Sequence, residues 1–71
     1  MMQWINIHEA LPGLHEKVLF TPTYNEGAIY IGELSAVGER GAAYFAVRNG
    51  KYKTSYSASH WMPLPALPKE E

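Results

Sequence analysis

The sequence contains no cysteine, no aspartate and no long hydrophobic run. Without cysteine, the chain cannot form a disulfide framework, a cysteine-ligated zinc site or a thiol nucleophile. Apolar stretches such as residues 28–31 have the length of a strand and fall far below the roughly 18 residues of a membrane span. No basic segment precedes an apolar core at the amino end, as a signal peptide would require. These absences predict a cytoplasmic location and no membrane contact.

Positive charge is not in excess either. The chain has six Lys and Arg residues and seven Glu residues, which gives a net charge of −1. This balance argues against a dedicated nucleic-acid-binding protein, which needs positive charge to neutralise phosphates. With 71 residues, of which 46% are hydrophobic, the chain is predicted to form a single small globular domain over residues 1–71.

Strand signals dominate the middle of the chain. β-branched and aromatic residues predict strands over residues 17–21 and 28–35, with turn residues between them. Gly32, inside the second run, predicts a bulge or the close approach of another backbone. The expected fold class is mainly β, or small α+β. Its core is an antiparallel meander of three to four strands.

One short helical turn is predicted near residues 7–11. Asn6 occupies the N-cap position of a capping box, and Pro12 prevents the helix from continuing. Leu11 is expected to point inward beside Trp4. The fold is therefore expected to combine the meander with a single helical turn.

The clearest local signal is the Asn49-Gly50 pair between the strand-like runs 42–48 and 51–56. This pair favours a two-residue type I′ hairpin turn, whose two central residues both need positive φ. With Asn49 and Gly50 as the loop, Arg48 is expected to face Lys51. Because side chains alternate along a strand, the hairpin has an apolar and a basic side. The predicted apolar side holds Phe45, Val47, Tyr52, Thr54 and Tyr56, and the basic side holds Tyr44, Arg48, Lys51 and Lys53.

The C-terminal residues 63–71 are predicted to form a proline-rich strap. Prolines at positions 63, 65 and 68 favour polyproline II, which places Leu64 and Leu67 on one edge. We expect this edge to pack on the domain. The alternative is a Pro-x-x-Pro ligand for a groove on another protein.

The two ends of the chain carry a family resemblance. The motifs are Trp4-Ile5, Glu9 and Leu11-Pro12 near the start, Lys17-Val18-Leu19 after them, and His60-Trp61-Met62-Pro63-Leu64-Pro65 with Pro68 at the end. Together they resemble the small phage and prophage proteins of the "domain of unknown function 551" family. The resemblance implies phage or prophage origin and a cytoplasmic accessory role, and it transfers no catalytic residues.

Metal and enzyme chemistry lack the patterns they need. His8, His15 and His60 have no recognised zinc-ligand spacing, so we expect no metal and no cofactor. Adjacent Ser59 and His60 are expected on opposite faces of a strand, which would prevent a hydrogen-bonded nucleophile and base. We therefore expect no catalytic residues, with an enzyme of unknown chemistry as the remaining alternative.

The basic side of the hairpin is the candidate binding surface. Like charges opposite one another in a hairpin are destabilising, so Arg48, Lys51 and Lys53 predict a surface that attracts an anion. Tyr44 would stack on a base or ring beside them. Alternatively, these charges only keep the hairpin edge from recruiting other strands.

The expected function is that of a non-enzymatic accessory protein that acts by binding. Its partner would be an unknown host protein, which it would inhibit, or a small anionic, nucleotide-like ligand, which it would sequester. The alternative is a weak nucleic-acid-binding module. Five tyrosines exceed what so small a core can bury, which predicts a homo-oligomer, most simply a dimer.

Overall fold

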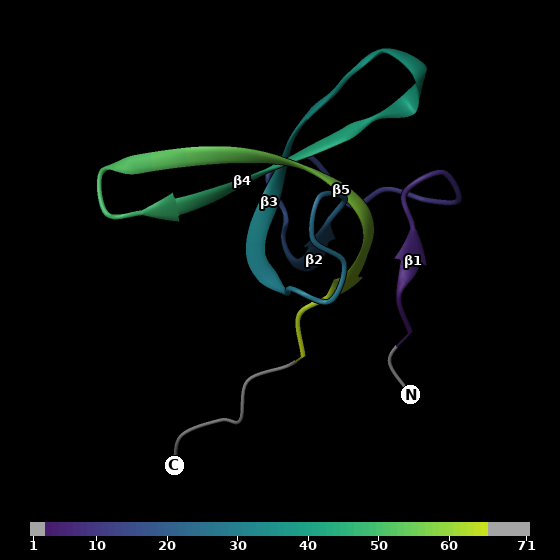
Figure 1. Cartoon of the computed structure of the whole chain (residues 1–71), viewed down its shortest axis with the longest axis horizontal. Coiled ribbons are helices and arrows are strands. Elements are labelled where there is room, and N and C mark those ends of the chain that lie inside the picture. Colours follow the sequence, from purple (N-terminus) through teal and green to yellow (C-terminus); the bar gives the residue numbers. More distant parts are fainter. Residues whose placement is uncertain (1–2, 66–71) are drawn as a thin grey trace.

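The computed structural model describes residues 3–65, which form an antiparallel β structure (Figure 1). The only helical element among these residues is a short 3-10 turn, Glu39–Gly41, so no helix of this part of the chain is long and apolar enough to cross a membrane. The mainly β prediction is confirmed. The strands are β1 (Ile5–Asn6), β2 (Lys17–Pro22), β3 (Tyr30–Val37), β4 (Ala43–Asn49) and β5 (Tyr52–Pro63).

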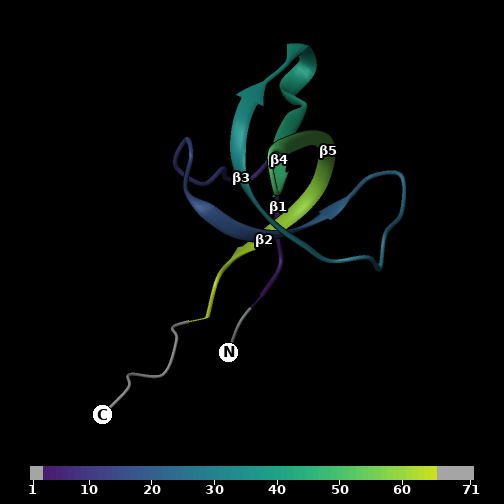
Figure 2. The same cartoon turned by 90° about the vertical axis from the view of Figure 1, so that its left-hand side faces the viewer.

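The four longer strands form the predicted meander and then close on themselves. The sheet order is β1-β5-β2-β3-β4, and β4 also pairs with β5. Closure depends on the length of β5, which pairs with β4 through its first half and with β2 through its second (Figure 2). Ala58 lies at the change of partner, opposite Ala43 on one side and Pro22 on the other. Local sequence patterns do not indicate this closure, because it joins strands more than 30 residues apart.

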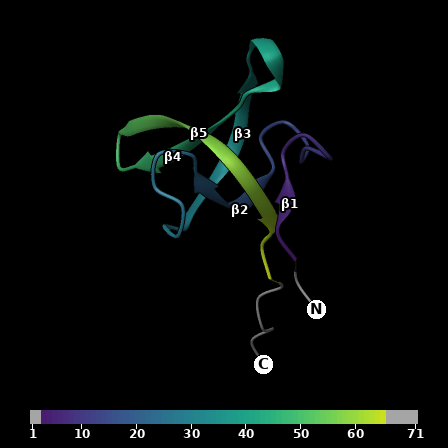
Figure 3. The same ribbon diagram turned by 45° about the vertical axis from the view of Figure 1, so that its right-hand side comes forward.

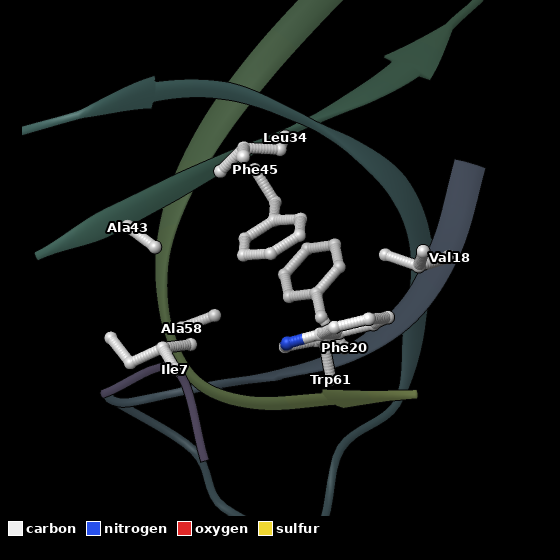
Figure 4. Packing of buried hydrophobic residues seen from close by; sticks show 8 residues of the cluster. All are labelled: Ile7, Val18, Phe20, Leu34, Ala43, Phe45, Ala58 and Trp61. Atoms are coloured by element: carbon white, nitrogen blue, oxygen red, sulfur yellow. The ribbon is translucent and has the colours of Figure 1, made fainter. Parts of the chain in front are cut away.

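Two stacked phenylalanines fill the space that the closed strands enclose (Figure 4). The Phe20 and Phe45 rings have centroids 4.9 Å apart and planes 18° apart, and both side chains are fully buried. Tyr30 packs its ring at 65° to Phe20, at the end of the core where Tyr24 and Tyr56 also lie. The whole buried cluster comprises Ile7, Val18, Phe20, Leu34, Ala43, Phe45, Ala58 and Trp61.

Gly32 lets β3 approach the Ala46 backbone and the Phe20 ring as closely as this core requires. A Cβ atom at this position would lie 2.6 Å from the Ala46 carbonyl oxygen and 2.8 Å from the Phe20 ring. The predicted close approach is therefore confirmed at Gly32. The register shift of β3 lies further along, between Leu34 and Ala36.

The predicted helical turn after Asn6 is present, but it does not develop into a helix. The Asn6 side-chain oxygen accepts a hydrogen bond from the His8 amide at 2.8 Å, as an N-cap does. The Ala10 amide donates to the Asn6 carbonyl at 3.3 Å, which completes a single turn. The chain then leads to Pro12, which is buried.

The expected inward packing of Trp4 and Leu11 is wrong. Both side chains are 40% exposed. In β1, Ile5 lies opposite Trp61 and packs against the core, so strand alternation turns Trp4 to the other side. Trp61 of β5 occupies the interior instead, and its indole N–H donates to the Ala10 carbonyl at 2.9 Å.

The register of the hairpin differs from the prediction, but the strand side chains are divided between its two faces as predicted. Asn49 pairs with Tyr52, so the loop residues are Gly50 and Lys51, and Arg48 lies opposite Lys53 rather than Lys51. Gly50 has φ of +66° and Lys51 has no positive φ, which is the pattern of a type II′ turn. The partner strand has shifted by two residues, and a shift of two retains the face of every side chain.

The proline-rich strap is only partly covered by the described residues. Pro63 is the last residue of β5 and lies opposite Val18, and Leu64 is 37% exposed, outside the core. The predicted packing of this edge is therefore not found at Leu64. Leu67 and Pro68 lie outside the described residues.

We predict that Gly32→Ala lowers the free energy of unfolding by about 1–3 kcal/mol, the usual cost of overpacking. The added methyl group would contact the Ala46 backbone, which cannot move without opening the β3–β4 pairing. Denaturant unfolding measures the change. Gly13→Ala is the control, because its Cβ would meet only the flexible Glu16 side chain, at 3.3 Å. Equal stability of the two variants would contradict the close approach.

Three tyrosines close one end of the barrel. The Tyr24 and Tyr30 hydroxyls are 2.9 Å apart, and the Tyr24 ring stacks on Tyr56 with centroids 5.9 Å apart. The hydrogen bond with Tyr30, helped by partial desolvation, favours the neutral phenol and raises the pKa of Tyr24 from 10.0 to about 12.

This raised pKa predicts an alkaline loss of stability. The folded chain holds the Tyr24 proton more tightly than the unfolded chain, so the free energy of unfolding falls as the pH rises from 10 to about 12. Tyr24→Phe should flatten this fall, whereas Tyr52→Phe, at a 73% exposed site, should leave it unchanged. Unfolding curves across this pH range test the difference. Parallel curves for wild type and Tyr24→Phe would rule out the linkage.

Candidate functional site

A cleft opens where the β4–β5 hairpin separates from β3. The β3–β4 pairing runs from Val37 opposite Ala43 to Glu33 opposite Ala46, and beyond this point the hairpin pairs only within itself. The hairpin projects away from the other strands in Figures 1 and 3. The cleft has a volume of about 220 Å³ and is lined by Lys17, Ile31, Gly32, Glu33, Ala46, Arg48 and Lys53.

The cleft brings together three cations from three strands. Lys17 comes from β2, Arg48 from β4 and Lys53 from β5, and all three are exposed. Within residues 3–65, none of them has a carboxylate within 4.0 Å. The lining contains one carboxylate, Glu33, whose oxygen lies 3.3 Å from the His15 imidazole. The cleft therefore carries a net positive charge.

The structure places only part of the predicted basic side in the cleft. Arg48 and Lys53 line it, whereas Lys51 lies in the hairpin turn. Tyr44 is four residues from Arg48, or about 13 Å along an extended strand. The Tyr44 ring instead covers Gly38, where a Cβ atom would lie 2.9 Å from it. Tyr44 is thus not positioned to stack on a group held in the cleft.

Lys17 and Glu33 were not identified from the sequence. They lie opposite each other in the β2–β3 register and point away from the core. Alternation along residues 17–21 identifies Lys17 as an outward residue. Its proximity to Arg48 depends on barrel closure, which no local pattern reveals.

A second hollow lies at the other end of β2, where the two ends of the chain meet. This groove has a volume of about 300 Å³. Its walls come from the segment before β1, from β2 and β5, and from the β2–β3 connection. The lining residues are Trp4, Thr21, Glu26, Gly27, Ile29, Ser59 and His60.

The Ser59–His60 geometry in this groove corrects the sequence-based expectation. The His60 Nδ1 atom lies 3.0 Å from the Ser59 hydroxyl oxygen, so the two side chains are hydrogen-bonded. Strand side chains lean along the strand, which allows an imidazole to reach its neighbour. Among the described residues, no third group hydrogen-bonds to His60 to orient it as a general base.

The histidines lie in three different surroundings. His15 contacts Glu33, His60 contacts Ser59, and His8 lies near Gly41. Over residues 3–65, no group of three or more potential metal-ligating side chains comes together.

The residues that carry the family resemblance have different surroundings. Pro12, Trp61 and Met62 are buried, whereas Leu11 is 40% exposed and Leu64 is 37% exposed. Trp4 and His60 line the groove instead. The β1–β5 pairing, with Asn6 opposite His60, brings the two ends of the chain together.

The closed strand order makes the chain a small antiparallel β-barrel protein with two hollows on its surface. The model of the family described as "Protein of unknown function (DUF551)" matches residues 3–69 of the chain. The chain therefore belongs to this family. No curated protein and no solved structure matches it.

Proposed function

We propose that the chain is a non-enzymatic accessory protein that acts by binding an anionic group in the basic cleft. The family resemblance suggests a phage or prophage setting and the cytoplasm of a bacterial host. The anionic group would belong to a small, nucleotide-like molecule that the protein sequesters, or to a host protein that it inhibits.

The observation that carries this proposal is the convergence of Lys17, Arg48 and Lys53 on one cleft, where no carboxylate of residues 3–65 lies within 4.0 Å of any of them. Arg48 and Lys53 are directly opposite one another, an arrangement that costs stability in a hairpin. A bound anion would offset this repulsion. The arginine fork and the two ammonium groups are the donors that phosphate and carboxylate groups prefer.

The floor and size of the cleft favour a small anionic group. Gly32 and Ala46 leave the floor without long side chains, and Ile31 supplies an apolar wall. A volume of about 220 Å³ suits one phosphorylated moiety rather than a duplex. The net charge of −1 gives no general attraction for nucleic acid, which makes a weak nucleic-acid-binding module the second candidate.

The positions of the reactive groups support the non-enzymatic part of the proposal. Among the residues that line the cleft, none is a serine, threonine or histidine, and the one carboxylate, that of Glu33, contacts His15. The hydrogen-bonded Ser59 and His60 pair lines the other groove.

Self-association remains part of the proposal. Tyr24 is 64% exposed and Tyr52 is 73% exposed, and aromatic side chains of this kind are enriched at interfaces. Light scattering at increasing concentration should detect a dimer, and a monomer throughout would exclude it.

Anion binding is tested by calorimetric titration with pyrophosphate and with a nucleoside diphosphate. We expect Lys53→Glu to weaken binding at least tenfold, because it replaces attraction with repulsion inside the cleft. A tenfold change in affinity corresponds to roughly 1.4 kcal/mol of binding free energy. Lys51→Glu is the matched control, since it changes the net charge equally from the hairpin turn.

Equal loss in the two variants would mean that only net charge matters, and the cleft would not be the site. A third titration uses single-stranded and duplex DNA at several salt concentrations. Tight DNA binding with a steep salt dependence would favour the nucleic-acid-binding alternative.

A further inference from the structure

We infer that the groove at Trp4 is a second binding site, selective for a guanidinium group, and that its occupant is an arginine side chain of a partner protein. The site is separate from the basic cleft and has the opposite charge preference. Two of its features converge on this chemistry: an accessible indole and a carboxylate that has no ion-pair partner among residues 3–65.

The indole of Trp4 supplies the face of the site. Trp4 is 40% exposed and is not a member of the buried cluster, so its ring is held at the surface beside Ile29. An exposed indole against an apolar wall is the surface on which a planar cation stacks best. An arginine side chain would cover both the Trp4 ring and the Ile29 side chain with its methylene stem.

Glu26 supplies the charge. Glu26 lies in the β2–β3 connection and is exposed. Among residues 3–65, no basic group lies within 4.0 Å of its carboxylate, and no other acidic residue lines the groove. The carboxylate is therefore available to a cation from outside.

These two features suit a guanidinium better than an ammonium ion. A guanidinium is planar and carries five N–H donors in a fixed fork, so one group can stack on Trp4 while it donates to Glu26. An ammonium is a compact charge that cannot stack in this way. The groove volume of about 300 Å³ accommodates a single such side chain.

The two tryptophans make the binding directly observable. Trp4 lines the groove, whereas Trp61 is only 7% exposed and its indole N–H is bonded to Ala10. In an NMR titration with N-acetyl-arginine-methylamide, we expect the Trp4 indole signal to shift and the Trp61 signal to stay in place. Trp4→Phe assigns the two signals. The citrulline analogue, which has the same shape without charge, should bind at least about fivefold more weakly.

Glu26→Gln should weaken binding of the arginine probe at least threefold, about the effect of one exposed ion pair. Glu39→Gln is the matched control, because Glu39 lies in the 3-10 turn and does not line the groove. A lysine probe that binds as well as the arginine probe would overturn the choice of a guanidinium. Equal effects of the two glutamate variants would overturn the site itself.

Pyrophosphate binding in the basic cleft should be unchanged in Trp4→Phe and in Glu26→Gln. This comparison distinguishes a failure of the groove site from a failure of the basic cleft.

Discussion

The contact between Phe20 and Phe45 is the constraint on which the rest of the structure depends. The two rings stack across the centre of the barrel, and they are the largest fully buried side chains of the described residues. They can meet only because β3 passes close to them with glycine at position 32. The four strands then close around one small core, and no charged side chain of residues 3–65 is buried. In so short a chain, this contact organises most of the buried apolar area.

Closure of the barrel also creates both hollows. β4 pairs with β3 only as far as Ala46, and beyond this residue the β4–β5 hairpin diverges from β3 and opens the basic cleft. At the far end of β2, β5 and the segment before β1 line one groove together with Thr21. Lys17 and Thr21 mark the two ends of one outward row on β2, about 13 Å apart. The two sites have opposite charge: three cations line one, and Glu26 lines the other.

The structure gives different roles to the residues that link the chain to its family. Trp61 and Pro12 are packing residues, since both are buried and the Trp61 indole is bonded to Ala10. Trp4 and His60 lie at the groove, where exposure of an aromatic ring contributes little to stability. The family resemblance thus identified two parts of the molecule, and only the β1–β5 pairing revealed that they are in contact.

The sequence by itself determined β2, β3, β4 and the first half of β5, the sorting of hairpin side chains into two faces and the close approach at Gly32. These properties are local, because alternation and turn chemistry act over a few residues. The hairpin register was not determined, since Gly50 can occupy either central position of a two-residue turn. The continuation of β5 as far as Pro63 was not determined either, because the prolines favoured an extended strap. Only the tertiary structure decided that Lys17 joins Arg48 and that Trp4 and His60 line one groove. Each of these placements depends on closing a loop of more than 25 residues, whose free energy comes from the shared core and leaves no signal in neighbouring residues.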